Sequence, residues 1–186
     1  MDTGINPQDL TAYSYNGTNE VFFNGDANST SDPQGLDAGL YVITKTTVQL
    51  VPGSANLDPQ DITQLDGKIY FAGTDSVKNG QINEGLFVYD PTNPNAAPSE
   101  IVANVEGQPG KTITLNSANY QLDMDSSNIG TQNPQAQIGT DGTLLYFTAT
   151  HGTTNQGLFA YDPATNTINT HVSGTGNANA FNLAHV

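Results

Sequence analysis

The fold of this chain is decided by two short stretches, Asp66-Gly67-Lys68-Ile69-Tyr70-Phe71 and Gly85-Leu86-Phe87-Val88-Tyr89-Asp90. The Asp-Gly pair is typical of a two-residue hairpin turn, because it readily supplies the positive φ angles that such a turn needs. The residues after it are apolar at consecutive positions, and this pattern predicts a strand with both faces buried. We therefore expect hairpin-connected strands in a sheet that other layers cover on each side.

Similar arrangements occur before and after this stretch. Each unit opens on an Asn-Pro-Gln or Asp-Pro-Gln sequence, at residues 6–11, 58–63 and, in a weaker copy, 133–138. Each continues with a turn, an aromatic strand, a Gly-Leu strand and a short closing strand. Four strands joined by tight turns form one meander, so the repeat predicts three four-stranded antiparallel sheets. The tail at 177–186 predicts the start of a further unit.

Tandem four-stranded units are typical of a β-propeller, in which each blade lies between two neighbours. The sequence therefore predicts one all-β, β-propeller-like domain over residues 1–186, with units at about 6–57, 58–132 and 133–176. We expect the middle unit to carry an added hairpin or a protruding loop within 103–132. A closed propeller usually needs at least four blades, which leaves three alternatives. The chain is a fragment of a longer propeller, it dimerises into a ring, or a partner or the insertion covers its open faces.

The charge of the chain excludes several classes of partner. Eighteen acidic residues face four lysines and no arginine, which gives a formal net charge of −14. This charge repels nucleic acid and anionic membrane surfaces. No apolar run approaches the roughly 18 residues that span a bilayer, so we expect no membrane insertion. There are no cysteines, which excludes disulfides and thiolate metal sites.

The strand motifs Gly67–Phe71 and Gly85–Asp90 resemble the propeller repeats of large extracellular bacterial proteins, of the kelch-like and hyalin-type group. In that group a Gly-Lys-aliphatic-aromatic-Phe strand precedes a Gly-Leu-aromatic-Val-aromatic-Asp strand. The chain departs from many such repeats in having no tryptophan. The resemblance implies propeller blades and an extracellular or cell-surface location, and it implies no particular chemistry.

Two acidic loops are candidate calcium sites. Asp26, Asn28 and Asp32 alternate along one of them, and Asp123 and Asp125 along the other. Carboxylate and amide oxygens are the ligands that Ca²⁺ prefers, so these residues are the predicted metal ligands. Neither loop has the glycine and the terminal glutamate of an EF-hand. The alternative is that these side chains only cap turns.

Nothing in the sequence predicts a catalytic site. The three histidines lie outside any metal-ligand spacing, and no Gly-x-Ser-x-Gly sequence is present. We therefore expect no enzyme and no obligatory cofactor. The favoured function is a structural or protein-interaction module of a surface-layer, adhesin or appendage protein, which contacts protein partners or self-assembles. The alternatives are a calcium-assisted carbohydrate-binding module that contacts a glycan and, less favoured, a propeller-type hydrolase or lyase.

Overall fold

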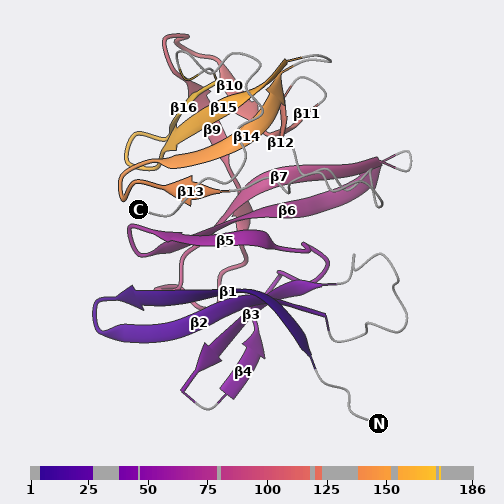
Figure 1. Cartoon of the computed structure of the whole chain (residues 1–186), viewed down its shortest axis with the longest axis vertical. Helices are drawn as coiled ribbons and strands as arrows, with labels where there is room; N and C mark the ends of the chain where they lie inside the picture. The colour runs from indigo at the N-terminus through magenta and orange to yellow at the C-terminus, as the bar shows by residue number, and fades with distance from the viewer. Residues whose placement is uncertain are drawn as a thin grey trace.

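The computed structural model describes residues 5–26, 38–45, 47–78, 81–117, 120–122, 138–151, 155–170 and 172. Within these ranges every regular element is a β-strand and no helix is present. The predicted all-β class is therefore confirmed. The strands form three open sheets stacked one above another along the long axis of the molecule (Figure 1).

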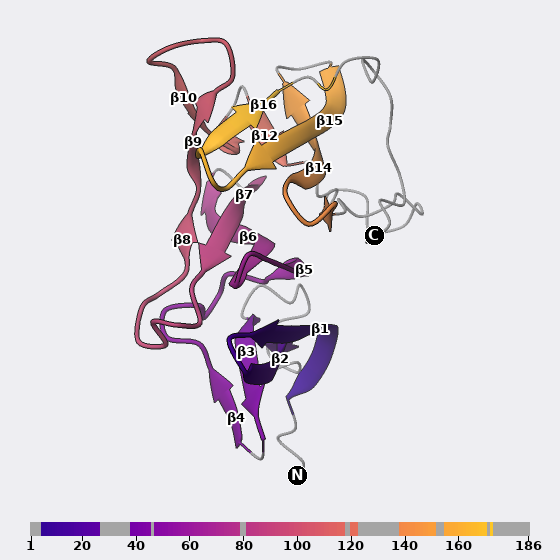
Figure 2. The same ribbon diagram turned by 90° about the vertical axis from the view of Figure 1, so that its left-hand side faces the viewer.

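The first and second sheets are four-stranded antiparallel meanders whose strands follow chain order, as the repeat predicted. Both sheets have their first strands on one side of the stack and their last strands on the other (Figure 2). The strands of the first sheet are β1 (Asn6–Tyr15), β2 (Thr18–Asp26), β3 (Gly39–Thr44) and β4 (Thr47–Leu50). Those of the second sheet are β5 (Gln60–Leu65), β6 (Lys68–Lys78), β7 (Gln81–Tyr89) and β8 (Ser99–Glu100).

The third sheet has eight strands among the described residues, which differs from the four that the repeat predicted. Its spatial order is β10-β9-β16-β15-β14-β12-β11, and β13 also pairs with β14. The extra strands come from the segment expected as an insertion, and they extend the β13–β16 meander at both edges. The strands are β9 (Val102–Val105), β10 (Thr112–Thr114), β11 (Asn116–Ser117), β12 (Tyr120–Leu122), β13 (Gly139–Thr140), β14 (Leu145–His151), β15 (Asn155–Asp162) and β16 (Thr167–Asn169).

One extended segment belongs to two sheets. Strand β8 pairs with β7 in the second sheet, and only Ile101 separates it from β9, which pairs with β16 in the third sheet. The β9–β16 pairing is parallel and joins Val105 to Ile168. The Ser99–Val105 segment therefore links the last strand of the second sheet to a strand next to one edge of the third sheet (Figure 2).

The predicted turns form at two of three places. Asn16-Gly17 and Asp66-Gly67 have positive φ at both residues, as a two-residue hairpin turn requires. At the third place only Gly142 has positive φ, and the connection runs from Thr140 to Leu145. There the Asp141 carboxylate accepts hydrogen bonds from the backbone N–H groups of residues 143 and 144, so its side chain shapes a longer turn.

The second sheet is buried on both faces, as the consecutive apolar residues predicted. Along β6, Ile69 and Phe71 pack in a cluster with the first sheet, whereas Tyr70 and Ala72 pack in a cluster with the third. Successive strand residues point to opposite faces, so consecutive apolar residues serve two separate cores. No residue of this run is more than 2% exposed.

An aromatic pair is stacked across two neighbouring strands of each sheet. The pairs are Phe71–Phe87 at 5.6 Å between ring centroids, Phe147–Phe159 at 6.0 Å and Phe23–Tyr41 at 5.5 Å. Their rings are nearly parallel in all three cases, with interplanar angles of 11°, 25° and 20°. The three sheets thus present a similar aromatic surface on one face.

Hydrogen bonds between sheets supplement this packing. Tyr13 donates its hydroxyl to the carbonyl of Gly67 at 3.1 Å, which joins the first sheet to the second. Gln64 and Ser14 exchange two further bonds, from the Gln64 amide to the Ser14 carbonyl and from the Ser14 N–H to the Gln64 Oε1 atom. Thr63 donates its hydroxyl to the carbonyl of Ile138 at 3.0 Å, which joins the second sheet to the third.

Thr63→Val is expected to lower the free energy of unfolding by about 1 to 2 kcal/mol, because it leaves the buried Ile138 carbonyl without this bond while preserving shape. Thr63 is 2% exposed. Urea unfolding followed by circular dichroism measures the change. The control is Thr47→Val on the exposed strand β4, where a loss under about 0.5 kcal/mol is expected. Equal losses in the two variants would show that the bond between sheets contributes nothing.

Candidate functional site

The predicted calcium ligands fall almost entirely outside the described residues. Asp26 ends β2, and only its backbone is described. Asn28, Asp32, Asp123 and Asp125 lie outside the described ranges. Calcium binding at these loops therefore stays a prediction, as does the glycan-binding alternative that depends on it. In the part of the chain that the structure describes, no three His, Asp or Glu side chains are grouped to hold a metal ion.

The candidate site that the structure does show is a pair of aspartates on the first strands of two neighbouring sheets. Strands β1 and β5 each carry a β-bulge, between Gln8 and Thr11 and between Gln60 and Thr63. Asp9 and Asp61 lie within these bulges, with φ angles of 50° and 51°. Aspartate tolerates this left-handed region better than most residues. We name Asp9 and Asp61 the bulge pair.

Position in the stack brings the bulge pair together. Strands β1 and β5 lie one above the other on the same side of the molecule, with β13 above them (Figures 1 and 2). Thr11 donates its hydroxyl to the carbonyl of Ile62, directly after Asp61. This hydrogen bond holds the two bulges in contact.

The environment of the bulge pair is electrostatically unfavourable for two negative charges. Burial and, as a smaller cause, the negative charge of Asp9 together raise the pKa of Asp61 from its ordinary value of 3.8 to about 7. The Oδ2 atom of Asp61 is buried and accepts no hydrogen bond from the described residues. Asp9 itself is exposed. Asp61 therefore takes up or releases a proton near neutral pH.

The chemistry open to the bulge pair is limited. A carboxyl group that titrates near neutrality can act as a proton donor or acceptor. A calcium site uses six to eight oxygen ligands, and two carboxylates fall well short of that number. Within the described ranges, the neighbouring hydroxyls of Thr11 and Thr63 are engaged by main-chain carbonyls. Among the described residues the pair is therefore two carboxyl groups held close together between two sheets, with no further titratable or nucleophilic group assembled beside it.

Other aspartates in the described residues hold loops and turns. Asp58 accepts hydrogen bonds from the side-chain amides of Asn24, at 3.1 Å, and Gln60, at 3.2 Å. Hydrogen bonds from the Thr165 hydroxyl and then from backbone N–H groups lower the pKa of Asp162, which lies at the end of β15. Backbone N–H groups and the Tyr146 hydroxyl lower the pKa of Asp141 in the same way. Asp141 and Asp162 therefore act as turn caps, whereas Asp58 joins the side chain of Asn24 in β2 to the segment before β5.

Sequence reasoning did not identify the bulge pair. Asp9 and Asp61 belong to the opening sequence of the first and second units, and the repeat pattern marks that sequence only as a unit boundary. The sequence signal that could have identified the pair is an aspartate directly after the Pro-Gln of the opening sequence in both units. A third acid is missing at the matching place, because residue 136 is alanine.

Comparisons with known proteins identify no family. No protein-family model matches the chain, and no curated protein matches it. One similar solved structure is a hypothetical protein from Leishmania major, with a TM-score of 0.36 and 14% sequence identity over 89% of this chain and 66% of that chain. A likeness at this level supports no inference about fold or function. Among the described residues, no helix is long and apolar enough to cross a membrane.

Proposed function

We propose that this chain is a propeller-type repeat segment and serves as a structural or protein-interaction module of an extracellular bacterial surface protein. A surface-layer, adhesin or appendage component fits this role. The proposal covers the β-propeller architecture as well as the function, because three stacked sheets would form part of such a ring.

The observation that supports the proposal is the use of polar side chains between the sheets. The hydroxyls of Tyr13, Thr11 and Thr63 each donate to a main-chain carbonyl of the next sheet. Buried polar groups of this kind hold layers in a fixed arrangement. In the described part of the chain, these groups join sheets to one another and are not directed at a shared site. The net charge of −14 favours solubility and disfavours nucleic acid as a partner.

The test is a deletion in the parent gene that removes this segment in frame, with protease accessibility and surface retention as readouts. External protease on intact cells is expected to cleave the wild-type protein. The deletion is expected to abolish either its retention on the cell surface or the adhesion of the cells. A matched control deletion removes an equal length elsewhere in the same protein.

Two results would contradict the proposal. One is a wild-type protein that external protease reaches only after cell lysis. The other is a deletion strain whose surface retention and adhesion both equal those of the wild type.

A further inference from the structure

One face of the first sheet carries apolar and aromatic residues at the same strand positions as the two faces that are buried between sheets. We call the face of each sheet that carries its stacked aromatic pair the front face, and the opposite one the back face. In the second and third sheets the front face packs on the back face of the preceding sheet. The front-face residues of the second sheet are Ile69, Phe71, Phe87 and Tyr89, and those of the third sheet are Leu145, Phe147, Phe159 and Tyr161.

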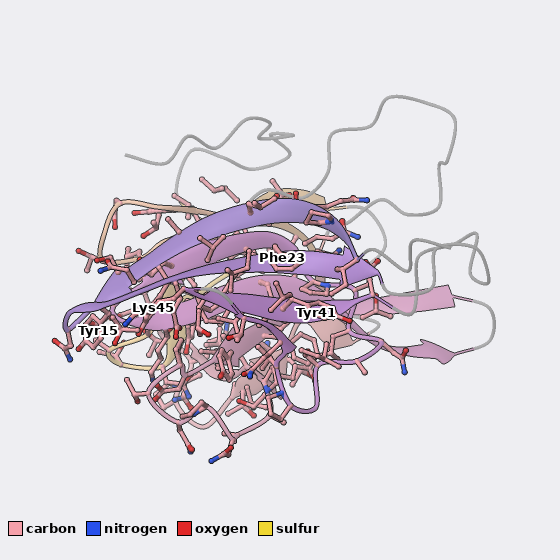
Figure 3. The ribbon with its side chains drawn as sticks, turned by 90° about the horizontal axis from the view of Figure 1, so that it is seen from below. Tyr15, Phe23, Tyr41 and Lys45 are labelled. Atoms are coloured by element: carbon pink, nitrogen blue, oxygen red, sulfur yellow. The ribbon has the colours of Figure 1, made fainter. Side chains whose placement is uncertain are left out.

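The first sheet has a matching front face with no sheet against it among the described residues. Strand register pairs Phe23 with Tyr41 and Val21 with Ile43, so the four side chains share one face. The next strand adds Val48, opposite Ile43, and Leu50, opposite Tyr41. Figure 3 looks at the molecule from this end and shows Phe23 and Tyr41 on neighbouring strands.

Exposure distinguishes the β4 edge of this face from its counterparts, whereas Phe23 at its centre is 2% exposed and so is nearly as buried as Phe71 and Phe147. Val48 is 48% exposed and Leu50 is 41% exposed. The residue of the third sheet that corresponds to Val48 is Ile168, because it pairs with Tyr161 as Val48 pairs with Ile43. Ile168 is 1% exposed. The same position is therefore exposed on β4, which is an edge strand, and buried on β16, which lies between β9 and β15 and packs in the cluster with the second sheet.

The surface that fits a front face is a back face, and the third sheet presents one. The buried back faces carry Phe22, Leu40 and Val42 in the first sheet, and Tyr70, Leu86 and Val88 in the second. At the same strand positions the third sheet carries Tyr146, Leu158 and Ala160. These three side chains are partly exposed. Aromatic, leucine and small aliphatic residues thus recur in the same order.

Charge supports the same match at one end of the sheets. Lys45 is exposed at the β3–β4 turn and lies at the same end of the first sheet as Tyr15 (Figure 3). The meander places Asp141 and Asp162 at the corresponding end of the third sheet. Lys45 is the only basic residue among the first 67. In a chain of net charge −14, this arrangement opposes the general repulsion between copies.

We propose that the front face of the first sheet binds the back face of the third sheet of a second copy of this chain. The contact continues the packing of the first sheet on the second and of the second on the third. It is heterologous, so it closes into a ring where the rotation permits and otherwise extends. The inference rests on the proposed interaction role and specifies its partner and its face.

Sedimentation velocity over a concentration series tests the inference on the full chain. The wild type is expected to associate as its concentration rises. Val48→Glu is expected to weaken association by about tenfold or more, because it buries an unpaired charge at the contact. Gln108→Glu, in the exposed turn after β9, adds the same charge outside the residues named for either face and is expected to change association less than about twofold. Thermal unfolding confirms that each variant is folded.

A mixing experiment tests which face is the partner. Ala160→Glu alters the back face of the third sheet and is expected to weaken association as strongly as Val48→Glu. An equimolar mixture of the two variants retains one intact contact, so it is expected to form dimers at concentrations at which each variant alone associates only weakly. If the first sheets paired with each other, Ala160→Glu would associate like the wild type, and the inference would be wrong.

Other sedimentation results would overturn the inference. A wild type that is monomeric at all concentrations, or one whose association survives Val48→Glu, overturns the inference. Equal weakening by Gln108→Glu overturns it as well, because general repulsion then explains the loss. None of these results affects the cell-surface test above. Self-association through this face in a protein found only inside cells would instead contradict the proposed function and leave the inference standing.

Discussion

Replacing Phe71 by alanine is expected to lower the free energy of unfolding by about 3 to 5 kcal/mol, because large-to-small substitutions in a closed core lose both burial and packing. Phe71 is 0% exposed and stacks on Phe87 in the cluster between the first and second sheets. Denaturant unfolding monitored by tyrosine fluorescence and circular dichroism measures the loss.

The loss of unfolding free energy depends on how much buried side-chain volume is removed. Two further variants therefore serve as controls. Phe71→Leu keeps most of the side-chain volume and is expected to cost about 1 kcal/mol. Phe147 is also 0% exposed and occupies the corresponding core position in the third sheet. Phe147→Ala is therefore expected to lower the free energy of unfolding by as much as Phe71→Ala. A loss below about 1 kcal/mol for Phe71→Ala would mean that the second sheet is not enclosed on this face.

Asp61→Asn is expected to stabilise the protein at pH 8 by about 1 to 3 kcal/mol and to have little effect at pH 4. The pKa of Asp61 is about 7 in the folded chain, against an ordinary value of 3.8, so folding favours its neutral form. Asparagine removes the buried charge and accepts the left-handed backbone conformation that residue 61 adopts.

The sign follows from linkage between protonation and folding. Below about pH 4 the carboxyl group is protonated in both states and imposes no penalty. Between about pH 4 and pH 7 the unfolded chain ionises first, so wild-type stability falls as the pH rises, and above about pH 7 the loss is complete. Each pKa unit corresponds to about 1.4 kcal/mol, and water at the exposed part of the side chain screens some of this.

Urea unfolding of the wild type and Asp61→Asn at pH 4, 6 and 8 isolates the contribution of this one group. Asp9→Asn serves as the companion variant. Because the charge of Asp9 raises the pKa of Asp61, removing it is expected to shift the pH dependence to lower pH and to give a smaller gain at pH 8. A stability difference between wild type and Asp61→Asn that stays constant with pH would contradict the assignment.

The residues that predicted the fold from sequence are those whose signal is local. Asp66-Gly67 forms the turn that its backbone preference requires. Ile69, Tyr70 and Phe71 alternate between two cores, as an unbroken apolar run between two layers must. The positions of the four-stranded meanders followed from these signals, which repeat along the first and second units.

The features that sequence reasoning missed depend on distant contacts. The parallel pairing of Val105 with Ile168 joins segments that are far apart in the chain. Neither segment has a local sequence pattern that identifies the strand with which it pairs. Strand preference of this kind is decided by tertiary context. The bulges at Asp9 and Asp61 were missed for a similar reason, since a single extra residue in a strand leaves the apolar pattern almost unchanged.

The continuous Ser99–Val105 segment has a mechanical consequence. When the chain is pulled at its ends, this segment would have to come away from β7 or from β16 before the second and third sheets could move far apart. No strand spans the first and second sheets in this way in the described ranges. Under force, the first sheet would therefore detach as one extension step, and the other two would yield together at higher load.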